Sequence, residues 1–95
     1  MIKRIVKMNF KKEAIEDFKC LFLAHKDDIR SFEGCLSLSL LQDLEDNSTF
    51  FTYSYWKSEQ LLDSYRQSDL FHSIWSKTKI LFNQRPQAWS VKEIS

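Results

Sequence analysis

The sequence between residues 50 and 71 changes from one regular pattern to another, and this change limits the folds open to the chain. Residues 50–56, FFTYSYW, are rich in aromatic side chains and alternate at period two, which is typical of a half-buried strand. From Ser58 onward the apolar spacing becomes helical, and Ser58 and Ser68 are both suited to cap a helix N-terminus. The stretch therefore predicts a strand that runs into a helix, with a break in that helix at Ser68. It is also where we expect the wall of any pocket.

The rest of the chain predicts three more strands and one more helix. Alternating apolar residues indicate the strands, and apolar residues three to four apart indicate the helix. Gly34, the only glycine, suits the reversal between helix and strand because glycine accepts a positive φ. The predicted elements are a strand at Ile2–Phe10, a helix from Lys12 to about Arg30, a strand at Cys35–Leu44, and a last strand at Ala88–Ile94 that follows Pro86.

The order β-α-β-β-α-β predicts a ferredoxin-like fold of the α+β class. With right-handed crossovers it forms a four-stranded antiparallel sheet with two helices on one face. The length of 95 residues fits a single domain over residues 1–95. The 14 basic and 13 acidic residues are dispersed along the chain and nearly balance, so we expect no nucleic-acid partner.

The sheet face without helices predicts a homodimer. We expect that face to be too apolar for full exposure to solvent, and its small residues to permit close approach. Packing two such sheets together about a twofold axis would bury both faces. The residues expected on this face are Ile5, Ser37, Ser39, Leu41, Thr52, Ser54 and Trp56.

Cysteine usage and hydropathy indicate a cytoplasmic protein. Cys20 and Cys35 lack the spacing of metal ligands, so we expect no metal site and two reduced thiols. No apolar stretch is long enough to cross a membrane, and the basic N-terminal segment lacks a secretory apolar run. We therefore expect no membrane association.

The segment WKSEQLLDSYRQSDLF, which begins at Trp56, resembles a corner of the antibiotic biosynthesis monooxygenase family, whose members are small dimeric α/β-barrel proteins. The order of elements extends the resemblance over essentially the whole chain. Many members carry a histidine where this chain has Tyr65, and another where it has Leu70. The matching positions are Trp56, Ser58, Leu62, Ser68 and Phe71, together with the Gly34–Cys35 turn.

The resemblance implies a dimeric α/β barrel and a cofactor-independent monooxygenase that acts on a small aromatic phenol or quinol. Once deprotonated, such a substrate passes an electron to oxygen by itself. The protein then supplies an apolar slot, a hydrogen-bonding group or base for the phenol, and exclusion of water. No cofactor is implied.

Two residues are candidates for the catalytic group. Tyr65 takes the place of the family's histidine and carries a proton-bearing oxygen, and the alternative is a core tyrosine whose hydroxyl reaches the surface. His72, at the edge of the apolar face of the second helix, would serve as a base near neutral pH, and the alternative is a solvent-facing histidine.

Four aromatic residues are candidates for substrate binding. Trp56 and Trp75 would sandwich a flat ring, although ordinary core packing explains the same spacing. Tyr53 would hydrogen-bond a ligand, with cross-strand packing as the alternative, and Phe71 would complete the wall.

Two other functions stay open from the sequence. One is a non-catalytic dimer that binds a small aromatic ligand, or a stress-related protein, on the same scaffold. The other is haem degradation, which a branch of the superfamily performs with an asparagine, a tryptophan and a histidine. At those positions this chain has Val6, Tyr65 and Trp75, so it lacks the axial histidine.

Overall fold

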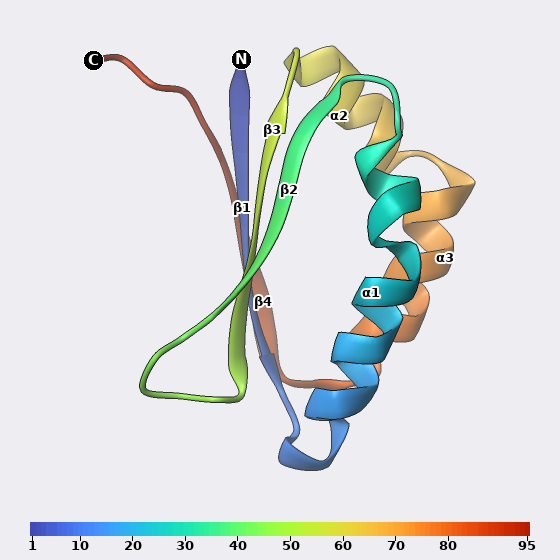
Figure 1. Ribbon diagram of the computed structural model, residues 1–95, viewed down its shortest axis with the longest axis vertical. Helices are drawn as coiled ribbons and strands as arrows, with labels where there is room; N and C mark the ends of the chain where they lie inside the picture. Colours follow the sequence, from blue (N-terminus) through green and yellow to red (C-terminus); the bar gives the residue numbers. More distant parts are fainter.

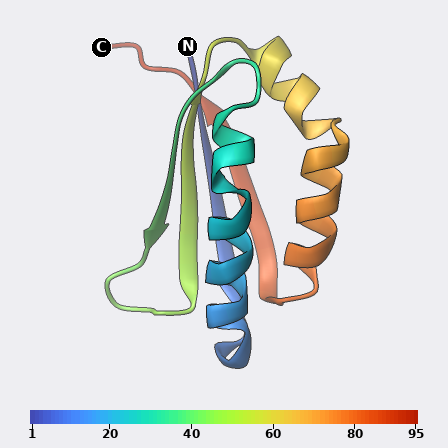
Figure 2. The ribbon, with the colours of Figure 1, turned by 45° about the vertical axis from the view of Figure 1, so that its right-hand side comes forward.

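The computed structural model describes residues 1–95 and has the predicted α+β, ferredoxin-like topology, with one antiparallel sheet and all helices on one of its faces (Figure 1). The strand order in the sheet is β2-β3-β1-β4. Figure 2 shows α1 and α3 side by side over the sheet. The elements are β1 (Ile2–Phe10), a short 3₁₀ helix η1 (Lys12–Ala14), α1 (Ile15–Arg30), β2 (Cys35–Gln42), β3 (Thr49–Trp56), α2 (Glu59–Arg66), α3 (Asp69–Lys79) and β4 (Phe82–Val91).

Aromatic residues fill the core between the sheet and α1. The rings of Phe10 and Phe18 stack with centroids 4.0 Å apart, and Phe50 meets Phe18 edge-on at 5.3 Å. All three side chains are buried. A second, smaller cluster at the other end of the sheet joins Trp56 to Leu62 of α2. Between these two clusters, side chains do not completely fill the space between the helices and the sheet.

The register of β1 against β3 decides which side chains of β3 face the helices. Met8 lies opposite Phe50, and both are buried against the helical layer. Because side chains alternate along a strand, every second residue after Phe50 faces the helices as well. The prediction that Thr52, Ser54 and Trp56 lie on the other face was therefore wrong. The residues that share the outer face are Ile5, Ser37, Ser39, Leu41, Phe51, Tyr53 and Tyr55.

The last strand begins at Phe82, earlier than the predicted start at Ala88. Pro86 lies inside this strand, where the pairing with β1 shifts register between Lys7 and Asn9. A proline is tolerated there because β4 is an edge strand and the bulge leaves residues without a ladder hydrogen bond.

The predicted break in the second helix is confirmed. The Ser58 hydroxyl accepts a hydrogen bond from the Leu61 amide at 3.2 Å, which caps α2. The Ser68 hydroxyl accepts one from the Phe71 amide at 3.1 Å, which caps α3. The two caps separate α2 from α3. None of the helices is long and apolar enough to cross a membrane.

Candidate functional site

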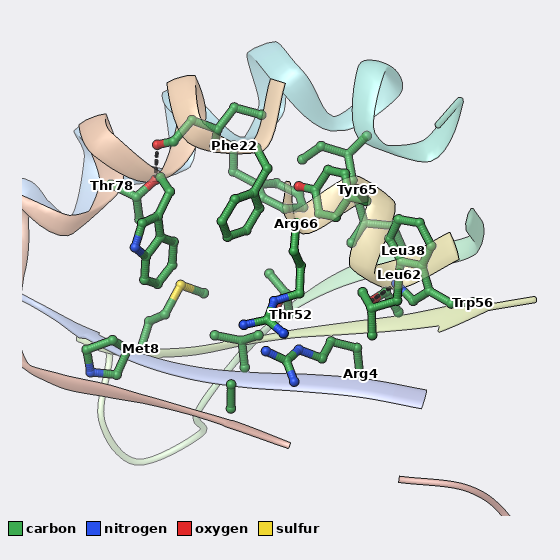
Figure 3. Close-up of a pocket in the computed structure, with 18 of the residues that line it drawn as sticks. Arg4, Met8, Phe22, Leu38, Thr52, Trp56, Leu62, Tyr65, Arg66 and Thr78 are labelled. Atoms are coloured by element: carbon green, nitrogen blue, oxygen red, sulfur yellow. Dashed lines mark hydrogen bonds between the residues drawn. The ribbon is translucent and has the colours of Figure 1, made fainter. Parts of the chain in front are cut away.

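A cavity of about 320 Å³ lies between the helical layer and the sheet (Figure 3). Strands β1 and β3 form its floor, and α2 and α3 supply much of its wall. Most of its lining is apolar, which is typical of a small-molecule site. The lining residues are Arg4, Val6, Met8, Phe18, Phe22, Ile29, Leu38, Thr52, Ser54, Trp56, Leu62, Tyr65, Arg66, Phe71, Ile74, Trp75, Thr78, Pro86, Gln87 and Ala88.

Tyr65, in the last turn of α2, lines this cavity with its ring held on several sides. Its ring stacks on the Trp56 indole and meets Phe32 and Phe71 edge-on, each with centroids 5.3 Å away. Its hydroxyl makes no hydrogen bond to any protein atom, yet it is not sealed from solvent. Burial raises the pKa of the Tyr65 phenol to about 12, with a smaller contribution from the negative charge that Cys35 acquires when it ionises. At neutral pH the Tyr65 hydroxyl therefore keeps its proton, and no protein atom accepts a hydrogen bond from it.

Trp56, the last residue of β3, also lines the cavity. Its side chain is 1% exposed, and its indole Nε1 donates a hydrogen bond to the Ser54 hydroxyl at 3.0 Å. Tyr65 stacks on the Trp56 indole, and the predicted sandwich of a ligand between Trp56 and Trp75 stays a prediction. Trp56 lies at the cavity as predicted, but it supports Tyr65.

Phe71 and Trp75 form the wall contributed by α3. Their rings stack with centroids 5.8 Å apart and planes at 12°, as expected for residues one helical turn apart. Both side chains are half-buried, and Phe82 meets the Trp75 indole edge-on at 5.5 Å. These rings present aromatic surface to a flat ligand.

Two of the predicted site residues lie elsewhere. Tyr53 is on the outer face of the sheet, and its hydroxyl is 3.3 Å from that of Tyr55. The alternation of β3 explains this, because Tyr53 and Trp56 differ by an odd number of positions. His72 is exposed on α3 and does not line the cavity, so the solvent-facing alternative describes it.

Two arginines that the sequence analysis did not select also line the cavity. Arg4 comes from β1, and Arg66 is the last residue of α2. A signal for Arg4 was present in the sequence, since it shares the apolar face of its strand with Val6 and Met8. Arg66 follows Leu62 by one helical turn, which places both on the same side of α2. No carboxylate or imidazole lines the cavity, and no three side chains of metal-binding type come together in the structure.

Comparison with known proteins gives one family. Residues 1–75 match the family model described as antibiotic biosynthesis monooxygenase. The chain belongs to the antibiotic biosynthesis monooxygenase family. The family assignment made from the segment at Trp56 is thus confirmed. A search of curated protein sequences finds no match to the chain.

Several solved structures share the fold at low sequence identity. One described as an antibiotic biosynthesis monooxygenase superposes with a TM-score of 0.93 at 21% identity, over 100% of both chains. A conserved protein from Methanosarcina mazei Go1 gives 0.93 at 22% identity, over 98% of this chain and 92% of its own. A protein from Mycobacterium tuberculosis gives 0.90 at 16% identity, over 99% and 95%. At this level of identity the likeness supports the fold alone.

Proposed function

We propose that this member of the antibiotic biosynthesis monooxygenase family is a cofactor-independent monooxygenase for a small aromatic phenol or quinol. The observation that carries the proposal is the Tyr65 hydroxyl, which keeps its proton at the wall of an aromatic cavity and has no hydrogen-bond partner in the protein. A bound phenolic oxygen would supply that partner. Phe71 and Trp75 offer stacking surface for the ring that carries it.

The proposed reaction needs only the substrate and molecular oxygen. An anthrone or quinol loses a proton, and the resulting anion passes one electron to oxygen to give superoxide and a substrate radical. The two radicals combine at carbon, and protonation gives a hydroperoxide. Cleavage of its O–O bond with loss of a C–H proton leaves one oxygen atom as the product carbonyl and releases the other as water.

Tyr65 acts in this scheme as a hydrogen-bond donor and not as a base. A phenol with a pKa of about 12 does not accept a proton at neutral pH, but it stabilises an anionic substrate oxygen and can protonate the peroxide. The half-buried rings around it limit the access of water to the reactive anion.

Oxygen uptake with a panel of naphthoquinols and anthrones tests the proposal. We expect turnover by the metal-free protein, and a loss of about 100-fold in Tyr65→Phe, the size of effect seen when one oxyanion donor is removed. Tyr53→Phe is the matched control, because Tyr53 lies on the other face of the sheet. Absence of turnover across the panel, or equal turnover in Tyr65→Phe, would refute the assignment.

The absence of a base in the cavity favours one other candidate, a non-catalytic ligand-binding or stress-related protein. The cavity contains neither a carboxylate nor an imidazole, and its tyrosine stays protonated. Such a protein would bind the same quinols, with quenching of its tryptophan fluorescence, but would consume no oxygen. The uptake experiment therefore separates the two functions.

We also propose that the protein acts as a homodimer through the outer face of the sheet. A row across all four strands places Ser39, Tyr53, Ile5 and Trp89 opposite one another on that face. Trp89 is 43% exposed and Leu41 47% exposed, although both are large apolar side chains. A second copy packed face to face would remove this aromatic surface from water and complete an α/β barrel.

A further inference from the structure

Two cationic side chains point into the otherwise uncharged cavity from opposite sides. Arg4 reaches it from β1 of the sheet, and Arg66 reaches it from the end of α2. Figure 3 shows both guanidinium groups within the space between the strands and the helices. Arg4 is half-buried and Arg66 is exposed, so the pair extends from the interior to the solvent.

Neither arginine has a carboxylate partner. The lysine ion pairs in the structure involve Lys3 and Lys19 instead, and the remaining contact of this kind joins His25 to Asp28. The only side-chain hydrogen bond of Arg4 is donated from Nη1 to the Ser90 hydroxyl at 2.9 Å, and that oxygen carries no charge. Burial of a cation without a counter-ion is unfavourable, and a second cation nearby increases the cost.

The electrostatics of Arg4 agree with this arrangement. Burial is the main cause that lowers the pKa of its guanidinium, and the charge of Arg66 lowers it further. Asp63, on the exposed side of α2, opposes the shift, but it forms no ion pair with either arginine. The inner part of the cavity therefore has a positive potential that the protein itself leaves uncompensated.

We propose that Arg4 and Arg66 bind an anionic oxygen group, a carboxylate or an ionised phenol, on the aromatic ligand of this cavity. Guanidinium groups match the planar arrangement of carboxylate oxygens, and they hold an anion more strongly where water is scarce. The apolar wall at Trp75 would hold the ring, and the arginines would fix its orientation.

The inference rests on the proposed monooxygenase function and concerns the same cavity. It explains how the substrate would be ionised there. Two positive charges next to a phenol lower its pKa, because they stabilise the phenolate. The substrate would then lose its proton to water without a protein base, which the cavity lacks. The binding step is testable in the absence of oxygen and therefore independently of turnover.

Calorimetric titration under nitrogen with 2-naphthoate and with its neutral methyl ester tests the carboxylate arm. We expect the anion to bind about tenfold more tightly than the ester, the size of one charge-assisted hydrogen bond. Arg4→Gln and Arg66→Gln should each remove that preference and leave the affinity for the ester unchanged. Arg85→Gln, an exposed arginine outside the cavity, is the control with the same change of net charge.

A second titration with 4-nitrophenol tests the phenolate arm. Its ionised form is yellow, so binding at a pH just below its own pKa should increase the absorbance of the wild type and not of Arg4→Gln. A response in either arm that depends on both arginines supports the proposal and identifies the anionic group. Equal affinities for anion and ester with no change in nitrophenol absorbance, or the same result in all variants, would overturn it.

The two proposals fail in different ways. Anion binding without oxygen uptake would leave the arginine site in place and refute the oxygenase. Oxygen uptake from neutral quinols that is unchanged in Arg4→Gln and Arg66→Gln would support the oxygenase and refute the arginine site. Melting temperatures of the variants show whether each is folded, and because Arg4 lacks a counter-ion we expect Arg4→Gln to be at least as stable as the wild type.

Discussion

The phenol ring of Tyr65 stacks on the indole of Trp56, with ring centroids 5.0 Å apart and planes at 26°. Trp56 is itself fixed by the hydrogen bond from its Nε1 to the Ser54 hydroxyl. The position of the proposed donor therefore depends on β3 as well as on its own helix. This stack explains why Tyr65 is buried enough for its pKa to rise.

Alkaline pH should destabilise the wild type more than Tyr65→Phe. The folded protein holds the phenolic proton with a pKa of about 12, whereas an unperturbed tyrosine has a value of 10.0. A raised pKa means that the stabilisation is complete below pH 10 and is lost as the pH rises toward 12. Over that range the wild type should lose about 2 kcal/mol more of its free energy of unfolding than the variant does.

Urea unfolding of both proteins at a series of alkaline pH values measures this difference. The ultraviolet absorbance of tyrosinate gives the ionisation directly, and Tyr65→Phe should remove the tyrosine whose pKa is about 12 in the wild type. Parallel stability curves for wild type and Tyr65→Phe would show that the phenol is not protected by the fold.

Ser54→Ala should destabilise the protein by about 1–2 kcal/mol, because it leaves a buried donor without an acceptor. The Trp56 indole is 1% exposed and Ser54 is 5% exposed, so water does not easily replace the lost hydroxyl. Ser39→Ala on the outer face of β2 is the matched control, since Ser39 is exposed. Equal unfolding midpoints in urea for the two variants would contradict the role given to Ser54.

The sequence predicted the starts of α2 and α3 well because local chemistry determines them, whereas the helical pattern that extends to about Asn83 overran the end of α3 at Lys79. Ser58 and Ser68 each cap the helix that follows, as their positions before apolar repeats indicated. The start of the last strand was missed because Pro86 resembles a boundary, and only the pairing with β1 shows that a bulge accommodates it.

The face of β3 was mistaken for a different reason. Both faces of that strand carry aromatic residues, so alternation separates Phe50 from Phe51 but does not show which is buried. The pairing of Phe50 with Met8 decides it, and this long-range contact has no local signal. Four of the six predicted site residues lie at the cavity, whereas Tyr53 was lost through the same ambiguity and His72 through its position on the exposed side of α3.

The turn that joins α1 to β2 depends on Gly34, and Gly34→Ala should be strongly destabilising. Gly34 has a φ of 91°, and an added Cβ would lie 2.5 Å from the Leu61 Cβ. The Leu61 Cβ belongs to a rigid part of its side chain, so a rotamer change does not relieve the contact. Together with the backbone strain, we expect a loss of about 2 kcal/mol or more in the free energy of unfolding.

Chemical denaturation of Gly34→Ala beside Glu33→Ala, an exposed neighbour in the same turn, measures this cost. Shortening Leu61 to alanine in the Gly34→Ala background should restore little stability, because the clashing Cβ remains. Full rescue by that second change would mean that the far end of the leucine side chain causes the strain.

Ile5→Glu should dissociate the proposed homodimer without unfolding the monomer. Ile5 lies on the outer face of the central strand β1, opposite both Tyr53 and Trp89, so in a face-to-face dimer its carboxylate would be buried without a partner. Burying an unpaired carboxylate costs several kcal/mol, and this cost would exceed the free energy of association of a moderate interface. Lys57→Glu, at an exposed residue between β3 and α2 and outside the sheet, adds the same carboxylate as a control. Light scattering should give a dimer mass for wild type and Lys57→Glu and a monomer mass for Ile5→Glu, whereas a monomeric wild type would refute the dimer itself.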